Sequence, residues 1–293
     1  MSTAGHLINS SLASSTRDNY KKVLEDLQAF AINHGWSGSL PANPGVIILF
    51  ITDLFLKGLA ATTLFSRISA LSYMHKINDV HDTTQHFLVQ KLLLGIKKVK
   101  PSADIRPPMT VLLLEQFLKA LSTHLYPVYK TYLFKCMLVL GFFGFLRPGE
   151  MTESCHNIPF EQVVITQKQV EITFKTFKHY HGRPITICIK SQQNSLCPVA
   201  CALKYLEIRG STPGPFFCMS NGDPVKYCEL LDLFKLLNSC VSSSKLSPHS
   251  LRIGAATHAA IIGLSQDEIQ RLGLWHSSAH LKYIRISSFD VKL

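Results

Sequence analysis

The residues of this sequence whose types and spacing could do chemistry gather near its C-terminal end, over residues 247–285. Ser247 and Pro248 place a capping hydroxyl before a proline at the first helical position, which predicts a helix from His249 onward. His249 and Arg252 are then one helical turn apart, so an imidazole and a guanidinium share one face. Because both groups can donate hydrogen bonds to one phosphate, the spacing indicates a phosphate-binding site.

The rest of this segment adds two aromatic residues. Ser265 and Glu268 form a capping box, which predicts a short helix that Gly273 ends. Trp275 follows in the turn, and Tyr283 lies on a last helix, one or two turns further on. The same pair of helices is also typical of a helix-turn-helix, a module that binds DNA without any chemistry. The segment alone leaves both interpretations open.

Further candidate residues lie upstream of this segment. Arg147 follows the strongly apolar residues 129–145, and Glu150 could pair with its guanidinium and fix its direction. Lys175 and Lys178 lie near the basic tip of a predicted β-hairpin. Residues three apart on a strand face opposite sides, so only one of these lysines could point at a common site.

The charge of the chain indicates a polyanionic partner. Its 30 lysines and arginines exceed its 19 aspartates and glutamates, which gives a formal net charge of +11 at pH 7. Nucleic acid and a membrane surface both fit such a charge. The apolar runs over residues 46–56 and 132–146 are shorter than the ~20 residues that a membrane span needs, and we find no secretory signal. We therefore expect an intracellular protein with no membrane partner.

The cysteines do not form a recognisable metal-binding pattern. All eight follow residue 130, and none belongs to a CxxC pair. A structural zinc site normally shows paired short spacings between its ligands. No P-loop and no GxGxxG motif occurs either. The sequence therefore predicts free thiols, no metal site and no cofactor.

Hydrophobic periodicity predicts a mainly α-helical protein with a small antiparallel β-sheet and two domains. We expect an N-terminal tail over residues 1–11, a bundle of four helices over 12–97, a basic linker over 98–108 and an α+β domain over 109–293. The predicted hairpin lies in the α+β domain. Basic residues at the linker are expected to contact the phosphate backbone of a nucleic acid: Lys97, Lys98, Lys100 and Arg106.

Taken together, the candidate residues resemble the tyrosine site-specific recombinases, also called the phage integrase family. The resemblance lies in the order and approximate spacing of Arg147, the hairpin lysine, His249, Arg252, Trp275 and Tyr283. It covers nearly the whole chain, since residues 16–97 are similar to the family's core-binding domain and residues 110–293 to its catalytic domain. The phrases HSLRIGAATHAA and LGLWHSSAHLKYIR particularly resemble the eukaryotic branch found in DIRS-type retrotransposons and Crypton-type DNA transposons.

This resemblance implies cleavage and rejoining of double-stranded DNA through a 3′-phosphotyrosine, as in site-specific recombination and DNA integration. Tyr283 would be the nucleophile, and Arg147 and Arg252 would hold the non-bridging phosphate oxygens. The hairpin lysine would protonate the leaving oxygen. Lys178, which is nearer the turn, is our first choice for this role and Lys175 our second.

The remaining roles also come from the resemblance. His249 would assist proton transfer, Trp275 would pack at the phosphate, and Glu150 would orient the first arginine. The family's biology implies a homo-oligomer on DNA, and the eukaryotic branch implies a nuclear location. Two alternatives stay open: a recombinase-derived protein that binds DNA without turnover, and a type IB topoisomerase, which shares the chemistry.

Overall fold

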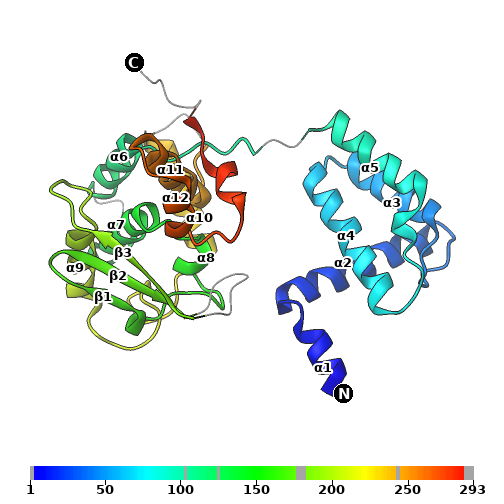
Figure 1. The fold of residues 1–293 in the computed structure, drawn as a ribbon, viewed down its shortest axis with the longest axis horizontal. Helices are drawn as coiled ribbons and strands as arrows, with labels where there is room; N and C mark the ends of the chain where they lie inside the picture. Colours follow the sequence, from blue (N-terminus) through cyan, green and yellow to red (C-terminus); the bar gives the residue numbers. More distant parts are fainter. Residues whose placement is uncertain (1–2, 102–103, 124–125, 176–182, 242–244, 287–293) are drawn as a thin grey trace. The chain divides into compact units, whose positions relative to one another are not determined.

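The computed structural model describes residues 3–101, 104–123, 126–175, 183–241 and 245–286 (Figure 1). The chain divides into two compact units, Met1–Asp104 and Ile105–Leu293, and the division falls within the segment predicted as a linker. Both units are mainly helical, and the strands of the described residues form one three-stranded antiparallel sheet in the second unit. The predicted fold class, mainly α with a small antiparallel sheet, is therefore confirmed.

The first unit is a helical bundle whose core comes from one face of each long helix. Its elements are α1 (Thr3–Ser10), α2 (Ser14–Asn33), α3 (Pro44–Leu56), α4 (Ala61–Ile77), the 3₁₀ helix η1 (Thr83–Gln85) and α5 (Phe87–Val99). The segment predicted as a tail contains α1, which buries none of its residues. The fourth helix expected from the sequence is two elements, because the backbone of His86 is non-helical and its side chain caps α5.

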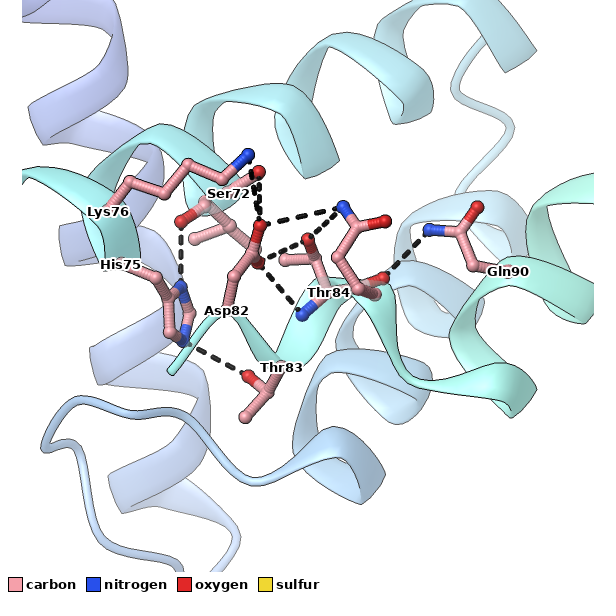
Figure 2. Close-up of polar contacts among 9 residues, drawn as sticks. Ser72, His75, Lys76, Asp82, Thr83, Thr84 and Gln90 are labelled. Carbon is pink, nitrogen blue, oxygen red and sulfur yellow. Dashed lines mark hydrogen bonds and ion pairs between the residues drawn. The ribbon is translucent and has the colours of Figure 1, made fainter. Parts of the chain in front are cut away.

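A cluster of polar residues connects α4 with the turn that precedes α5 (Figure 2). Asp82 accepts hydrogen bonds from Ser72 Oγ at 2.6 Å, Thr84 Oγ1 at 2.6 Å and Thr84 N at 3.2 Å, and it pairs with Lys76 Nζ at 3.4 Å. Burial raises the pKa of Asp82, but the hydrogen bonds from these three residues outweigh it and lower the pKa to about 2. The carboxylate is therefore held ionised.

His75 extends this cluster into the core of the bundle, where it is fully buried (Figure 2). Its Nδ1 lies 2.7 Å from Leu71 O, and its Nε2 lies 3.0 Å from Ala42 N and 3.1 Å from Thr83 Oγ1. Because Nε2 accepts from the Ala42 N–H, Nδ1 must carry the proton that Leu71 O accepts. The ring is thus neutral, and both of its nitrogens have partners within the bundle.

The second unit combines helices with a small sheet, one face of which is buried. Its elements are α6 (Val111–Leu121), α7 (Val128–Phe143), α8 (Pro148–Met151), the 3₁₀ helix η2 (Phe160–Gln162), β1 (Val163–Ile165), β2 (Gln169–Phe174), β3 (Ile185–Lys190), α9 (Pro198–Arg209), α10 (Tyr227–Val241), α11 (Pro248–Ile261), α12 (Gln266–Leu272) and the 3₁₀ helix η3 (Ser278–Tyr283). The strand order is β1-β2-β3, with Val170 opposite both Ile165 and Ile189. Helix α9 packs against the sheet.

The core of this unit is built around α7, which packs against α6, α9 and α11. All residues from Cys136 to Phe142 are buried, as the unbroken apolar sequence indicates. Helix α11 also approaches the start of the unit, where Met109 N donates to Ser250 O at 2.8 Å. A Cβ on Gly254 would come within 2.0 Å of Met109 O, so only glycine allows this contact.

Among the described residues, no helix combines the length and the apolar character needed to cross a membrane. All eight cysteines are free thiols. In the same described part of the chain, no three histidine, cysteine, aspartate or glutamate side chains are placed to hold a metal ion.

Candidate active site

Arg147 lies between α7 and α8, where Glu150 holds it in place. Its Nη1 donates to Glu150 Oε1 at 2.8 Å, and its main-chain N donates to Oε2 at 2.7 Å. Nη2 donates to Leu274 O at 3.1 Å. The Glu150 side chain is 3% exposed and that of Arg147 21%. A buried carboxylate therefore fixes the orientation of a guanidinium that still reaches solvent, as the sequence predicts for this pair.

Arg252 projects from α11 and is buried, with only 2% of its surface exposed. Its Nη1 donates to Phe145 O and its Nη2 to Gly273 O. Its Cζ lies 4.1 Å from the centre of the Trp275 ring, which covers the guanidinium. A guanidinium carries five N–H groups, so these two carbonyls leave others for a ligand.

The surroundings of Arg252 disfavour the charged form of its guanidinium. Burial lowers the pKa of its guanidinium to about 9, and the nearby Arg147 acts in the same direction. Glu150 and Tyr283 act in the opposite direction but do not cancel the first two effects. Arg252 is still protonated at neutral pH, so the site contains two close cations and one buried carboxylate.

Two bulky residues with left-handed backbone conformation supply carbonyls to these arginines. Phe145 has φ of 52° and Leu274 has φ of 50°. Residues with side chains rarely adopt this region, and those that do are concentrated at functional sites. Phe145 O accepts from Arg252, and Leu274 O accepts from Arg147. The strained positions are thus the ones that hold the two guanidinium groups.

Trp275 and Tyr283 close over Arg252 from the turn after α12. Their ring centres lie 5.2 Å apart, and the Tyr283 ring lies 5.8 Å from Arg252 Cζ. A Cβ on Gly273 would lie 1.7 Å from the Trp275 ring, so this position requires glycine. Thr257 Oγ1 donates to Tyr283 O at 3.1 Å and thereby ties η3 to α11. The helix expected to carry Tyr283 is this short 3₁₀ helix.

His249 is the second residue of α11 and is partly buried. As the sequence predicts, α11 begins after Ser247. The main-chain N of Ser247 donates to Ser250 Oγ at 3.0 Å, but Ser247 Oγ has no hydrogen-bond partner among the described residues, so the predicted capping by this hydroxyl is not seen. His249 therefore lies one helical turn before Arg252, which places both residues on one face of α11.

Of the two lysine candidates, only Lys175 lies among the residues that the structure describes. Lys175 directly follows β2 and is exposed. Lys178 lies outside the residues that the structure describes. The choice between the two stays a prediction.

The candidates near the linker have different surroundings. Lys97 and Lys98 are exposed in the last turn of α5. Lys100 Nζ instead donates to the carbonyl oxygens of Gly58 and Leu59, at 3.0 and 3.1 Å, so it supports the end of α3. Arg106 is partly buried. Contact of these four residues with DNA remains a prediction.

Sequence reasoning missed several residues that shape the site. Phe145 and Leu274 contribute main-chain carbonyl groups. Every residue has such a group, so the types of their side chains do not indicate this role. Thr257 looks like an ordinary helical residue. His280 is 3% exposed and its ring centre lies 6.1 Å from that of Trp275, while its Nε2 has no hydrogen-bond partner among the described residues. The sequence identified Gly273 only as the end of a helix, and its close contact with the Trp275 ring was not predicted.

Comparison with known proteins relates this fold to DNA recombinases. No protein-family model matches the sequence, and no curated protein matches it. Among solved structures, the chain is similar to a lambda integrase dimer bound to a COC′ core site, with a TM-score of 0.67 and 16% identity over 99% of this chain and 77% of that one. It is also similar to the Tn1549 transposon integrase in complex with a circular intermediate DNA, with a TM-score of 0.63 and 14% identity over 96% and 93% of the two chains.

A third similar structure is the XerH site-specific recombinase bound to a palindromic difH substrate. Its TM-score is 0.61, at 15% identity over 85% of this chain and 71% of that one. At such low identities these similarities establish the fold, which is that of the tyrosine recombinases and integrases, including the helical unit and the α+β unit.

Proposed function

We propose that this chain cleaves and rejoins DNA strands through a covalent 3′-phosphotyrosine on Tyr283. The observation that carries the proposal is the packing of Arg252 beneath Trp275 and Tyr283, with Arg147 close enough to lower its pKa. Residues more than a hundred positions apart thus form one cationic, aromatic site. A phosphodiester is poorly reactive, and positive charge at its non-bridging oxygens is what a metal-free cleavage requires.

The reaction exchanges one phosphodiester bond for another. The Tyr283 hydroxyl attacks the scissile phosphorus and loses its proton, while the bond from phosphorus to the 5′-oxygen breaks. The leaving 5′-oxygen takes up a proton. A 5′-hydroxyl of another strand then attacks the phosphotyrosine, which releases Tyr283 and rejoins the DNA. The bond free energy is retained throughout, so no ATP is consumed.

The two arginines would act at different stages, because their exposure to solvent differs. Arg147, which reaches solvent, would contact the phosphate first. Arg252 would contribute its charge once the phosphate enters beside Trp275. Removing one such preorganised donor typically lowers the rate about 10²–10³-fold. By resemblance, His249 would assist the proton transfer from Tyr283, and Lys178 or Lys175 would protonate the leaving oxygen.

The charge and the fold support double-stranded DNA as the partner. The net charge of +11 suits a protein whose affinity comes mainly from phosphate contacts. Structures of three proteins with a similar fold are complexes with DNA. The proposal extends to a homo-oligomer on DNA, to a recombinase of the DIRS-type or Crypton-type branch and to action in the nucleus.

The test is covalent trapping on nicked duplexes, which lose the rejoining strand after cleavage. The parent chain should form a denaturant-resistant protein–DNA adduct, and Tyr283→Phe should not. Tyr227→Phe is the matched control, because Tyr227 is an exposed tyrosine on α10 and should leave the adduct unchanged. An adduct that survives Tyr283→Phe would remove Tyr283 as the nucleophile. Tight duplex binding without any adduct would favour a recombinase-derived binding protein.

A further inference from the structure

A cavity of about 410 Å³ opens in the second unit between α6, α7 and α9. Its volume is within the range of small-molecule sites in proteins. Three lysines line it, each from a different helix: Lys119, Lys135 and Lys204. One carboxylate, that of Glu115, lines the same cavity. The lining therefore has an excess of positive charge that converges from separate elements.

Lys135 is the most enclosed of these cations. Its Nζ donates to Ser122 Oγ at 2.6 Å, and among the ion pairs of the described residues none involves it. Burial lowers the pKa of its ammonium, and Lys204 acts in the same direction. Two lysines thus lie close enough to repel each other without a carboxylate between them. Such an arrangement is relieved by a bound anion.

The remaining groups of the cavity do not supply the missing negative charge. Cys201 also lines the cavity, but burial raises the pKa of its thiol to about 11, so it is neutral at physiological pH. Among the other polar lining groups, Asn194 and Ser195 can donate hydrogen bonds to an oxyanion, whereas the Ser122 hydroxyl already donates to Leu118 O at 2.9 Å. The chemistry of the cavity matches a phosphate group.

The cavity is separate from the candidate active site. It shares none of the residues around Arg252 and Tyr283. Lys135 lies eight residues before the end of α7 at Phe143, which corresponds to about 12 Å along the helix. In Figure 1, α9 and η3 lie on opposite sides of this unit. A phosphodiester at Tyr283 therefore could not also occupy the cavity.

We propose that this cavity binds the phosphate group of a small phosphorylated molecule, held between Lys135 and Lys204. The proposal goes beyond DNA cleavage and does not depend on it. A small ligand suits a concave site in which cations converge from three helices, whereas a DNA backbone is followed by cations spread along a surface.

The experiment uses inorganic pyrophosphate as the probe and isothermal titration calorimetry on the full chain. The parent should bind it saturably, and Lys135→Gln combined with Lys204→Gln should weaken the affinity about tenfold or more, because two charge-assisted hydrogen bonds are lost. Lys168→Gln with Lys190→Gln is the matched control, since both are exposed lysines of the same unit and the change in net charge is equal. The control should bind like the parent.

Three results would overturn the proposal. They are no saturable binding by a folded parent, an equal loss of affinity in the control pair, or a loss of duplex DNA affinity in the cavity variant with unchanged pyrophosphate binding. Lys135→Arg, which keeps the charge, should retain binding and guards against a variant that fails through misfolding. Adduct formation by Tyr283 should be the same in both double variants, so the cavity and the cleavage hypothesis can fail separately.

Discussion

The two units each contain a buried cluster of charged and polar residues, and the clusters differ in how completely they are neutralised. In the first unit, Asp82 and His75 have partners for both carboxylate oxygens and both ring nitrogens. In the second unit, two cations, Arg147 and Arg252, lie near one carboxylate, that of Glu150, which pairs with Arg147. Burial lowers the pKa of Arg252. A satisfied cluster stabilises a fold, whereas a cluster with surplus charge is built to receive a ligand.

The largest effect is expected from Arg252→Met. It should slow formation of the tyrosine adduct about 10²–10³-fold, because a charge at the phosphate is lost. The melting temperature should change little, because removing the desolvation cost of a buried cation offsets the loss of a hydrogen-bond partner for the carbonyl groups of Phe145 and Gly273. Adduct kinetics on nicked duplexes and thermal unfolding measure the two effects. A large fall in melting temperature with normal cleavage would show that this cluster is structural after all.

A second substitution tests the packing that covers Arg252. The Cβ of Gly273→Ala would overlap the Trp275 ring and displace it, which should cost about 1–3 kcal/mol of unfolding free energy. Cleavage should fall as well, because Trp275 leaves the guanidinium. Gly95→Ala is the control: it lies in α5 with nothing within 4 Å, and it should stabilise the chain by about 0.5–1 kcal/mol. Unchanged Trp275 fluorescence in Gly273→Ala would contradict the prediction.

The satisfied cluster predicts a different dependence on pH. The pKa of Asp82 is about 2 in the folded protein and 3.8 for a free carboxyl, so the folded state binds this proton less tightly. Its contribution to stability is complete above about pH 4 and is lost as the pH falls through 2. Asp82→Asn should lower the unfolding free energy by about 1–3 kcal/mol at pH 7 and lose this acid dependence. Urea unfolding across this pH range is the measurement.

The smallest effect concerns Lys100. The sequence predicts that it contacts DNA, whereas in the structure its Nζ donates to the carbonyl oxygens of Gly58 and Leu59, just after α3. If the structural role dominates, Lys100→Met should lower stability by about 0.5–1.5 kcal/mol and leave the salt dependence of duplex binding unchanged. If Lys100 contacts a phosphate, the slope of log affinity against log salt should fall by about one. Lys97→Met, at an exposed position of α5, is the comparison.

Much of the fold was predictable from local chemistry. Ser265 caps α12, as its capping box with Glu268 predicts. Hydrophobic periodicity predicted a mainly helical chain with a small antiparallel sheet. The break before α5 was missed because His86, whose side chain caps this helix, is not one of the usual N-cap residues.

The site was predictable only in part. Arg147, Arg252, Trp275 and Tyr283 were chosen by residue type and spacing, and the structure brings them together. The sockets of the two arginines are the carbonyl oxygens of Phe145, Gly273 and Leu274, which accept their hydrogen bonds. These sockets could not be predicted, because every residue has a main-chain carbonyl group. The left-handed conformation at Phe145 and Leu274 contradicts the ordinary preference of both residues, so it follows from tertiary packing.

Sockets made of carbonyl groups depend on the path of the backbone and hardly on the identity of its side chains. Mutations elsewhere around such an arginine can accumulate as long as the chain follows the same course, which at Gly273 requires glycine. A site supported in this way tolerates extensive sequence drift. This offers a physical reason why a chain only 16% identical to the lambda integrase can share its fold and still place Arg252 beneath an aromatic pair.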